Sequence, residues 1–199
     1  MKLPKKRLLV SPTWYKDNIP KKSFRFEEKD SFDYTDRYQQ DIVMNPLVPH
    51  HSLQKHLVLY DKTGIPRFAL AYMEVAGIFE IYAIQRLRTQ YVQISQNKYE
   101  WSPALETEAN KRFAKELGMF PSEFIMCEFL HRFADEIKSG KPVRLRIYSL
   151  VKNKSLIANI YGPIIERFFK PKPIFENEVL TIYELSLDKK RVRAILGLD

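Results

Sequence analysis

The sequence contains a single cysteine, Cys127, among its 199 residues, and this scarcity excludes two kinds of architecture. One thiol cannot form an intrachain disulfide, and it cannot build a cysteine-rich metal site. Cys127 falls inside an apolar segment with helical spacing, where a small core residue is expected rather than a nucleophile. Because low cysteine usage favours a reducing compartment, we predict a cytoplasmic protein.

Long apolar segments and familiar catalytic motifs are also missing. No apolar run approaches the ~20 residues that span a bilayer, and the opening apolar stretch is too short for a secretory signal, so no membrane span is expected. There is no GxSxG motif, no phosphate loop rich in glycine and no dinucleotide fingerprint, which leaves hydrolase, kinase and dehydrogenase functions without support. His50, His51 and His56 have no carboxylate or cysteine at ligand spacing, so no metal site is predicted.

Positive charge is unevenly distributed in this chain, whose formal net charge is +9. Residues 1–22 carry seven Lys or Arg against Asp17, and residues 138–173 carry nine against Glu166, whereas the segment between them has an acidic excess. This concentration favours a polyanionic partner, either nucleic acid, an anionic membrane or a phosphorylated small molecule. A solubilising surface is the other interpretation. We predict a basic N-terminal arm over residues 1–22 and a single domain over residues 23–199.

The first half of that domain has the pattern of an antiparallel meander. With 45% hydrophobic residues the chain can bury a substantial core. Residues 55–75 are predicted to form two strands joined around Gly64, because glycine supplies the positive φ that a tight turn needs, and residues 78–85 form a third strand. Weaker patterns predict an early strand at 22–32, a short helix at 34–45 and a loop at 45–51.

The second half alternates helices with strands. A serine cap, an early proline and a closing glycine predict a helix over 102–118, and apolar residues at helical spacing predict another over 121–140. Residues 142–151 alternate apolar with polar side chains, which is typical of a strand with one buried face. A helix at 155–169 and a strand at 177–187 complete an α+β arrangement around a mixed sheet.

This order, together with the residues at the end of the 78–85 strand, resembles the GNAT acetyltransferase superfamily. In that superfamily the fourth strand carries the acyl-CoA thioester, the loop after it holds the pyrophosphate, and the next strand and helix form the other wall of the CoA cleft. Residues 79–85 would be the fourth strand, 86–93 the start of the phosphate loop and 143–153 the fifth strand. The resemblance therefore implies a GNAT-like α+β fold with a mixed, mostly antiparallel sheet flanked by helices.

The resemblance also implies a reaction and a set of site residues. The reaction is N-acyl transfer that depends on acetyl-CoA or another acyl-CoA, in which an amine substrate attacks the thioester directly. Glu80 or Tyr82 would act as the base, Tyr161 would protonate the departing thiolate, and backbone amides near Tyr82 to Ile84 would stabilise the oxyanion. The residues expected to contact the cofactor are Ala83, Ile84, Gln85, Arg86, Arg88 and Asn153.

The loop after Gln85 departs from the usual phosphate loop and leaves alternatives open. Many GNAT proteins place glycines there, whereas Arg86 is followed here by Leu87 and Arg88, so the loop is degenerate. The two arginines suit phosphate oxygens, or else they form a solvated turn with a cation–π contact to Tyr91.

A second function therefore stands beside acyl transfer. The chain is alternatively a catalytically inactive GNAT-like basic protein that binds nucleic acid or another polyanion. The basic arm, with Trp14 and Tyr15 beside its lysines, would then grip the backbone and stack on bases. Arg144 and Arg146 form either part of a basic patch or the exposed side of an edge strand.

Overall fold

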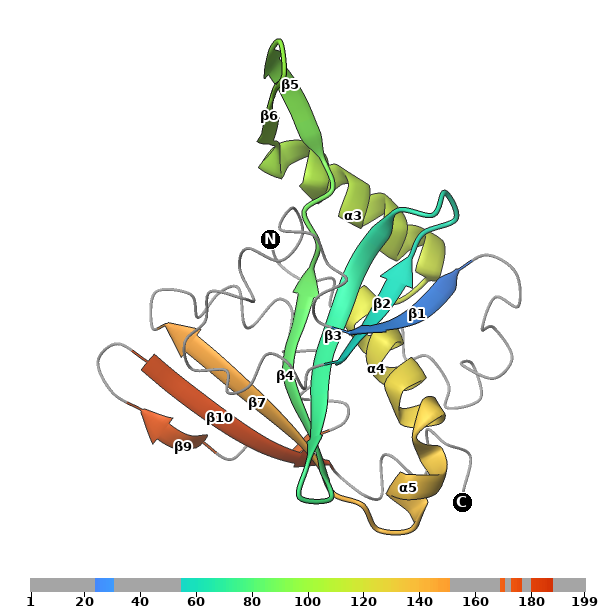
Figure 1. The fold of residues 1–199 in the computed structure, drawn as a ribbon, viewed down its shortest axis with the longest axis vertical. Coiled ribbons are helices and arrows are strands. Elements are labelled where there is room, and N and C mark those ends of the chain that lie inside the picture. Colours follow the sequence, from blue (N-terminus) through green and yellow to red (C-terminus); the bar gives the residue numbers. More distant parts are fainter. Residues whose placement is uncertain (1–23, 31–54, 151–168, 171–172, 177–179, 188–199) are drawn as a thin grey trace.

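The computed structural model of this chain describes residues 24–30, 55–150, 169–170, 173–176 and 180–187. In these residues the larger sheet has eight strands, in the order β1-β2-β3-β4-β7-β10-β8 with β9 also paired to β10, and β5 and β6 form a separate sheet (Figure 1). The strands are β1 Arg25–Asp30, β2 Lys55–Tyr60, β3 Pro66–Val75, β4 Ile78–Arg86, β5 Tyr91–Ser95, β6 Lys98–Trp101, β7 Val143–Leu150, β8 Phe169–Lys170, β9 Pro173–Glu176 and β10 Leu180–Leu187. The helices are α3 Pro103–Leu117, α4 Pro121–Arg132 and α5 Ala134–Lys138.

The predicted meander is confirmed, since β1, β2, β3 and β4 are sequential antiparallel neighbours. Gly64, with φ of 81°, closes the turn between β2 and β3. Between β3 and β4 the two-residue turn at Ala76 and Gly77 has positive φ at both positions, 49° and 75°. This is the pattern of a type I′ turn, whose twist matches that of the flanking strands.

The sheet is mixed because β4 and β7 are parallel, whereas its other pairings are antiparallel. The predicted fold class, an α+β fold with a mostly antiparallel sheet flanked by helices, is therefore confirmed. β7 lies between β4 and β10. The interpretation that placed Arg144 and Arg146 on an edge strand is wrong, because both neighbouring positions in the sheet are filled.

Local capping explains where the first long helix begins and ends. The Ser102 side chain accepts a hydrogen bond from the amide of Leu105, Pro103 occupies the first turn, and Gly118 ends the helix in the left-handed region with φ of 69°.

The predicted helix over 121–140 is instead two helices, α4 and α5. They are separated at Phe133, whose φ of −107° and ψ of 26° are not helical.

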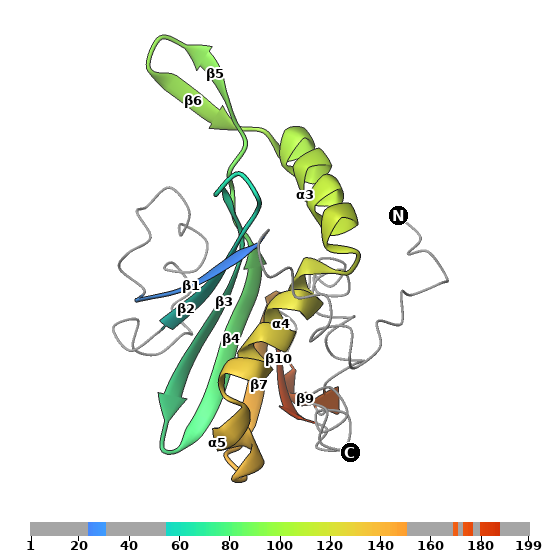
Figure 2. The same cartoon turned by 90° about the vertical axis from the view of Figure 1, so that its right-hand side faces the viewer.

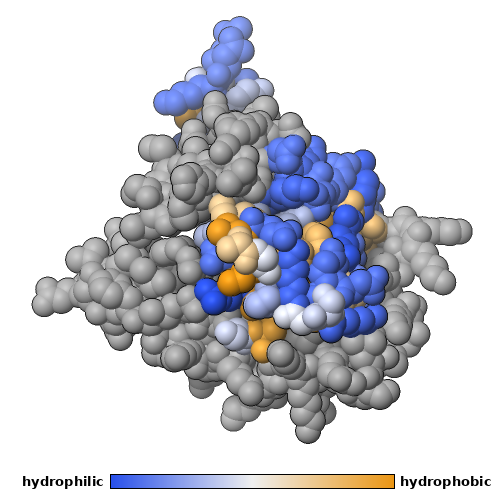
Figure 3. Space-filling model, turned by 60° about the horizontal axis from the view of Figure 1, so that its bottom comes forward, coloured by the Kyte–Doolittle hydropathy of each residue, from blue (hydrophilic) through white to orange (hydrophobic). Residues whose placement is uncertain are grey.

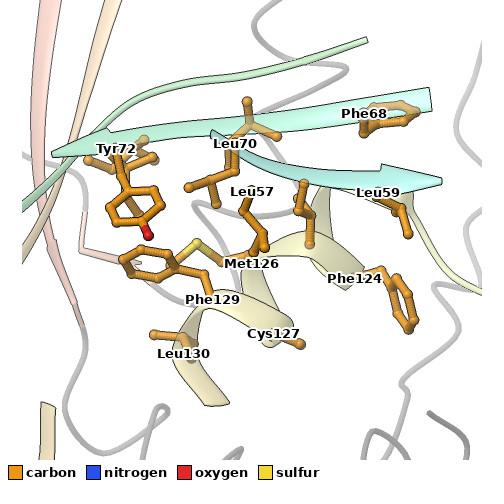
Figure 4. Packing of buried hydrophobic residues seen from close by; sticks show 14 of the residues in the cluster. Leu57, Leu59, Phe68, Leu70, Tyr72, Phe124, Met126, Cys127, Phe129 and Leu130 are labelled. Atoms are coloured by element: carbon orange, nitrogen blue, oxygen red, sulfur yellow. The ribbon is translucent and has the colours of Figure 1, made fainter. Parts of the chain in front are cut away.

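The main hydrophobic core lies between the sheet and α3 and α4, which run along one face of the sheet (Figure 2). Side chains of β2 and β3 point toward α4 across this interface (Figure 4). Cys127 is buried there as a free thiol, as expected. Among the described residues, the largest fully buried side chains are Phe124, Phe129, Leu57, Leu59, Leu70, Ile81, Ile84, Leu87, Ile125 and Met126.

Four aromatic rings account for the break between α4 and α5. The rings of Tyr72 and Phe79 on the sheet meet those of Phe129 and Phe133, with centroids 4.6–6.4 Å apart. Edge-to-face and tilted contacts of this kind add to the stability that burial provides. Phe133 reaches both sheet rings from the point at which the helix is interrupted.

Around the β3–β4 turn, the described residues expose few apolar side chains. Figure 3 shows a small group of hydrophobic atoms among hydrophilic ones on this side. Val75, which precedes the turn, is 41% exposed. Single exposed apolar residues are ordinary on protein surfaces and need no partner.

Four predicted segments fall on residues outside the described part of the chain. They are the basic arm at 1–22, the helix at 34–45, the loop at 45–51 and the helix at 155–169, except that its last residue, Phe169, lies in β8. The strand at 22–32 is confirmed as β1, the strand at 142–151 as β7 and the strand at 177–187 as β10.

The opposite face of the sheet is buried as well and contains a histidine. His56 on β2 is 1% exposed and alternates with Leu57, which faces the helices. Its cross-strand neighbours are Lys29 on β1 and Ala71 on β3. Burial lowers the pKa of His56 to about 4 because the charged imidazolium loses its hydration there.

We expect this histidine to make the fold sensitive to mild acid. The unfolded chain binds a proton at His56 near the ordinary pKa of about 6.5, whereas the folded chain does so only near pH 4, so stability falls as the pH drops through this window. The loss should reach about 3 kcal/mol by pH 4. Urea unfolding at pH 7 and pH 4.5, compared between the wild type and His56→Leu, isolates the effect. The same pH dependence in both proteins would contradict it.

Candidate functional site

A β-bulge in β4 marks the centre of the candidate site. The β3–β4 register pairs Ala71 with Ala83 but Tyr72 with Ile81, so Tyr82 is an extra residue on β4. A bulge bends its strand and increases the local twist. Because of this extra residue Ile81 and Ile84 both contribute to the core beneath the helices, although they are three residues apart.

The parallel pairing of β4 with β7 stops at the same place. Its register runs from Phe79 opposite Val143 to Ile81 opposite Leu145, whereas β4 continues to Arg86 and β7 to Leu150. The two strands start side by side and then diverge (Figure 1). The bulge at Tyr82 thus coincides with the point of divergence, which is where the sequence analysis expects the thioester.

Two of the predicted catalytic residues form a buried hydrogen-bonded pair at this point. The Tyr82 hydroxyl donates to Glu80 Oε2 at 2.6 Å, and the two residues are 5% and 7% exposed. They lie on the sheet face opposite the helices, where Tyr82 packs against Met73. Arg144 is opposite Glu80 in the parallel register, and residues in register share a face.

Chemically, this pair can accept and relay a proton. A carboxylate is the natural acceptor for a proton that leaves an ammonium group, and the phenol is held to it in a fixed orientation. A purely structural role would use the same hydrogen bond to satisfy a buried carboxylate. The two roles differ in their consequences for activity, which a substitution can measure.

The remaining predicted residues are distributed along and beyond the end of β4. Ala83, Ile84 and Gln85 continue the strand opposite β3, and Arg86 ends it with an exposed side chain. Arg88 stacks over the ring of Trp101, 4.5 Å from the centroid. Trp101 was not named in the sequence analysis, and the expected cation–π contact to Tyr91 stays a prediction. Tyr161 and Asn153 lie outside the described residues.

The loop after β4 is held by a carboxylate that the sequence analysis did not single out. Glu106, in the first turn of α3, is 4% exposed, and its Oε2 accepts hydrogen bonds from the amides of Thr89 at 2.6 Å and Gln90 at 2.9 Å. Thr89 Oγ1 donates to the same carboxylate, and Asn110 Nδ2 lies 3.4 Å from Oε1. An anion at this position is also favoured by the N-terminal end of the helix dipole.

Arg67 links this carboxylate to a second one. Its Nε donates to Asp61 Oδ2 at 2.7 Å, and its Nη1 donates to Thr89 Oγ1 at 2.8 Å and lies 3.9 Å from Glu106 Oε1. Burial by itself would raise the pKa of Asp61, but hydrogen bonds from Thr63, Ile65 and Arg67 outweigh it and hold that pKa below its ordinary value. Both carboxylates are therefore anchored to one guanidinium.

This network bears directly on whether the loop fits a diphosphate. The resemblance assigns phosphate binding to the backbone that follows β4, where amide groups would donate to the anion. Here the amides of Thr89 and Gln90 already donate to Glu106, whose negative charge would repel another anion. These two amides do not fit the diphosphate of CoA, and exposed Arg86 is the remaining cation of this segment that is directly accessible.

No sequence signal identified Glu106 or Arg67. Glu106 follows the capping serine by four residues rather than the three of a capping box, so it reads as an ordinary surface residue of α3. Arg67 sits near the start of a strand that continues with Phe68, Ala69, Leu70 and Ala71, so its neighbours in the sequence suggest only a buried strand. Glu106 is joined to Gln90, Thr89 and Arg67, which lie 16 to 39 positions away in the sequence, and only the fold brings these residues together.

Two searches of the described residues gave negative results. None of the helices there is long and apolar enough to cross a membrane. In the same part of the chain, no group of three or more His, Cys, Asp or Glu side chains could hold a metal ion.

Comparisons with known proteins identify no family for this chain. No protein-family model matches the sequence, and no curated protein matches it. Among solved structures, the chain is similar to a crystal structure described as "putative N-acetyltransferase from Lactobacillus plantarum", with 10% sequence identity and a TM-score of 0.37. The match covers 83% of this chain and 99% of that chain. A likeness at this TM-score carries no argument about fold or function. The functional proposal therefore depends on the strand order and the side-chain contacts.

The network around Glu106 predicts a large effect of a small substitution. Glu106→Gln keeps the shape but removes the charge that balances Arg67 and brings an NH₂ donor among other donors. We expect it to lower the free energy of unfolding by ~3 kcal/mol, as measured by urea denaturation. The matched control is Glu108→Gln on the same helix, whose carboxylate is exposed and which should leave the unfolding transition unchanged. Equal transitions for both variants would contradict the role of Glu106.

Proposed function

We propose that this protein is a GNAT-like acyltransferase that moves an acyl group from a thioester to an amine beside the bulge of β4. The observation that supports it is the coincidence of three features at one point of the sheet. The bulge at Tyr82, the divergence of β4 from β7 and the buried Glu80–Tyr82 pair all occur there.

In this proposal Glu80 accepts the proton that the ammonium group of the substrate loses. The amine nitrogen then forms a bond to the carbonyl carbon of the thioester, and the carbon–sulfur bond breaks. The departing thiolate takes a proton from an acid, for which Tyr161 is the predicted residue. Tyr82 is a positioning residue, because its hydroxyl fixes the orientation of the Glu80 carboxylate.

The acyl donor in this proposal is acetyl-CoA or another acyl-CoA, which supplies a carbonyl activated for attack. The β4 segment Tyr82 to Ile84 would lie along the thioester. Arg86 and Arg88 stay predicted contacts to its phosphates, together with Gln85 and Asn153. Because the amides of Thr89 and Gln90 are engaged by Glu106, phosphate binding would depend on side chains more than on the backbone.

Replacing the proposed base tests the chemistry. Glu80→Gln retains an oxygen that can accept the Tyr82 hydrogen bond but cannot take up the substrate proton, so we expect the rate of thiol release from acetyl-CoA with a panel of primary amines to fall about 10²–10⁴-fold. Glu74→Gln is the control, because its carboxylate lies exposed on the neighbouring strand β3 and should leave the rate unchanged. A Glu80→Gln enzyme with the wild-type rate would exclude the proposed base.

The occupied amides of the loop predict a particular pattern of ligand binding. Acetyl-CoA at ~100 times its dissociation constant should add ~2.7 kcal/mol to the stability of the fold. We expect 3′-phospho-ADP at the same concentration to raise the melting temperature much less, because its diphosphate lacks backbone donors here. Arg86→Ala should reduce the acetyl-CoA shift further. Equal shifts with the two ligands would show that the nucleotide is the part that is recognised.

The Glu106 network also favours the second function. A GNAT-like protein that no longer binds a cofactor has no use for free loop amides, and a carboxylate of its own can satisfy them. The same titration, run with a short DNA duplex at two salt concentrations, distinguishes the alternatives. A shift with DNA that weakens at high salt, without one with acetyl-CoA, would favour the polyanion-binding protein over the enzyme.

A further inference from the structure

The β5–β6 hairpin projects from the body of the molecule (Figures 1 and 2). Val92, Ile94 and Tyr99 are 38%, 48% and 58% exposed, and they make up three of the five exposed large hydrophobic residues in the described part of the chain. Among the described strands, β5 and β6 pair only with each other. A two-stranded hairpin of this kind is marginally stable in water unless a further element covers or extends it.

The two edge strands of the hairpin differ in how well they could form hydrogen bonds with an added strand. On β5 the register shifts between Gln93 and Ser95, which marks a bulge, and bulges hinder the addition of another strand. On β6 the residues from Lys98 to Trp101 carry no such extra residue. The regular edge available for pairing is therefore that of β6.

The base of the hairpin is fixed to the body. The amide of Ser102 donates to the carbonyl of Gln90 at 2.8 Å, and Arg88 stacks on Trp101. The amides of Thr89 and Gln90 are held by Glu106. These contacts hold both strands where they leave the body, so a partner on β6 would be held in a defined orientation.

We propose that β6 pairs with β6 of a second copy of this chain, antiparallel and across a two-fold axis at Tyr99. This register places Lys98 opposite Glu100 of the partner subunit, and Glu100 opposite Lys98 of the partner subunit. Tyr99 then lies opposite Tyr99 of the partner subunit. The pairing extends each two-stranded sheet into a continuous four-stranded one, as the closed symmetry of most homo-oligomers allows.

Charge complementarity favours a second copy over an unrelated partner. Lys98 and Glu100 are both exposed, and within the described part of the chain neither forms an ion pair. Directly opposed opposite charges stabilise antiparallel strands, whereas like charges destabilise them. A four-residue strand whose central tyrosine is flanked by one cation and one anion is complementary to itself only in the antiparallel sense.

The full-length protein tests this pairing through its oligomeric state. Sedimentation velocity over a range of concentrations should show a dimer for the wild type. Lys98→Glu alone places two carboxylates opposite each other, and Glu100→Lys alone places two ammonium groups opposite each other, so each should weaken the dimer at least tenfold. The double variant K98E/E100K restores both pairs and should recover wild-type association.

Control variants distinguish dimerisation through the β6 edge from dimerisation through another surface. Lys111→Glu reverses a charge on exposed α3 and should leave the dimer intact. Melting curves for each variant establish that the body remains folded, as expected for residues on a projecting hairpin. A wild type that stays monomeric up to ~100 µM overturns the proposal. A dimer that neither single variant weakens, or that the double variant does not restore, also overturns it.

Discussion

The buried carboxylate of Glu106 is the interaction on which the arrangement of this domain depends. It accepts the amides of Thr89 and Gln90 at the exit of β4 and, through Arg67, it is tied to Asp61 in the turn after β2. The meander, the base of the β5–β6 hairpin and the first turn of α3 therefore meet at one charged centre. A buried charge is tolerated only when its hydrogen bonds are satisfied, so each of these elements constrains the position of the others.

The bulge at Tyr82 also determines which side chains of β4 face the core and which face away from it. It allows β4 to place Ile81 and Ile84 in one core while Glu80 and Tyr82 face the opposite side. It also ends the parallel pairing with β7 after three residue pairs. The proposed base Glu80 precedes the inserted residue by two positions, and the two side chains meet on the same face at this point.

Local patterns predicted those elements whose signals are local. Alternation and glycine turns located β2, β3 and β4, and a cap and a closing glycine located α3. The β5–β6 hairpin was missed even though the segment that begins at Tyr91 alternates and Asn97 supplies a turn residue with φ of 64°. The resemblance had assigned that segment to a phosphate loop, and this assignment took precedence over the local pattern.

Features that depend on distant contacts could not be predicted in this way. The interruption at Phe133 comes within an uninterrupted helical pattern and is associated with rings on the sheet that the sequence does not place nearby. The bulge in β4 contains no glycine that would indicate it in the sequence. Glu80 and Tyr82 were named as alternative bases, but their burial and mutual hydrogen bond follow from the fold and had no sequence signal.

The position of Glu106 also limits how any anionic ligand can approach the end of β4. A diphosphate that used the amides of Thr89 and Gln90 would have to displace the Glu106 carboxylate. That carboxylate would then stay buried without its two amide donors, with only the guanidinium of Arg67 nearby. Breaking such a buried arrangement costs ~3–5 kcal/mol, which would cancel a large share of the binding energy of a micromolar ligand, ~8 kcal/mol. An anion that binds without this displacement must use side chains instead. In this segment the cations are the exposed guanidinium of Arg86 and the half-buried guanidinium of Arg88, which stacks on Trp101. In the proposed acyl transfer, the donor would therefore be recognised mainly through its acyl and thioester end, and its phosphates would be held by side chains at the edge of the site.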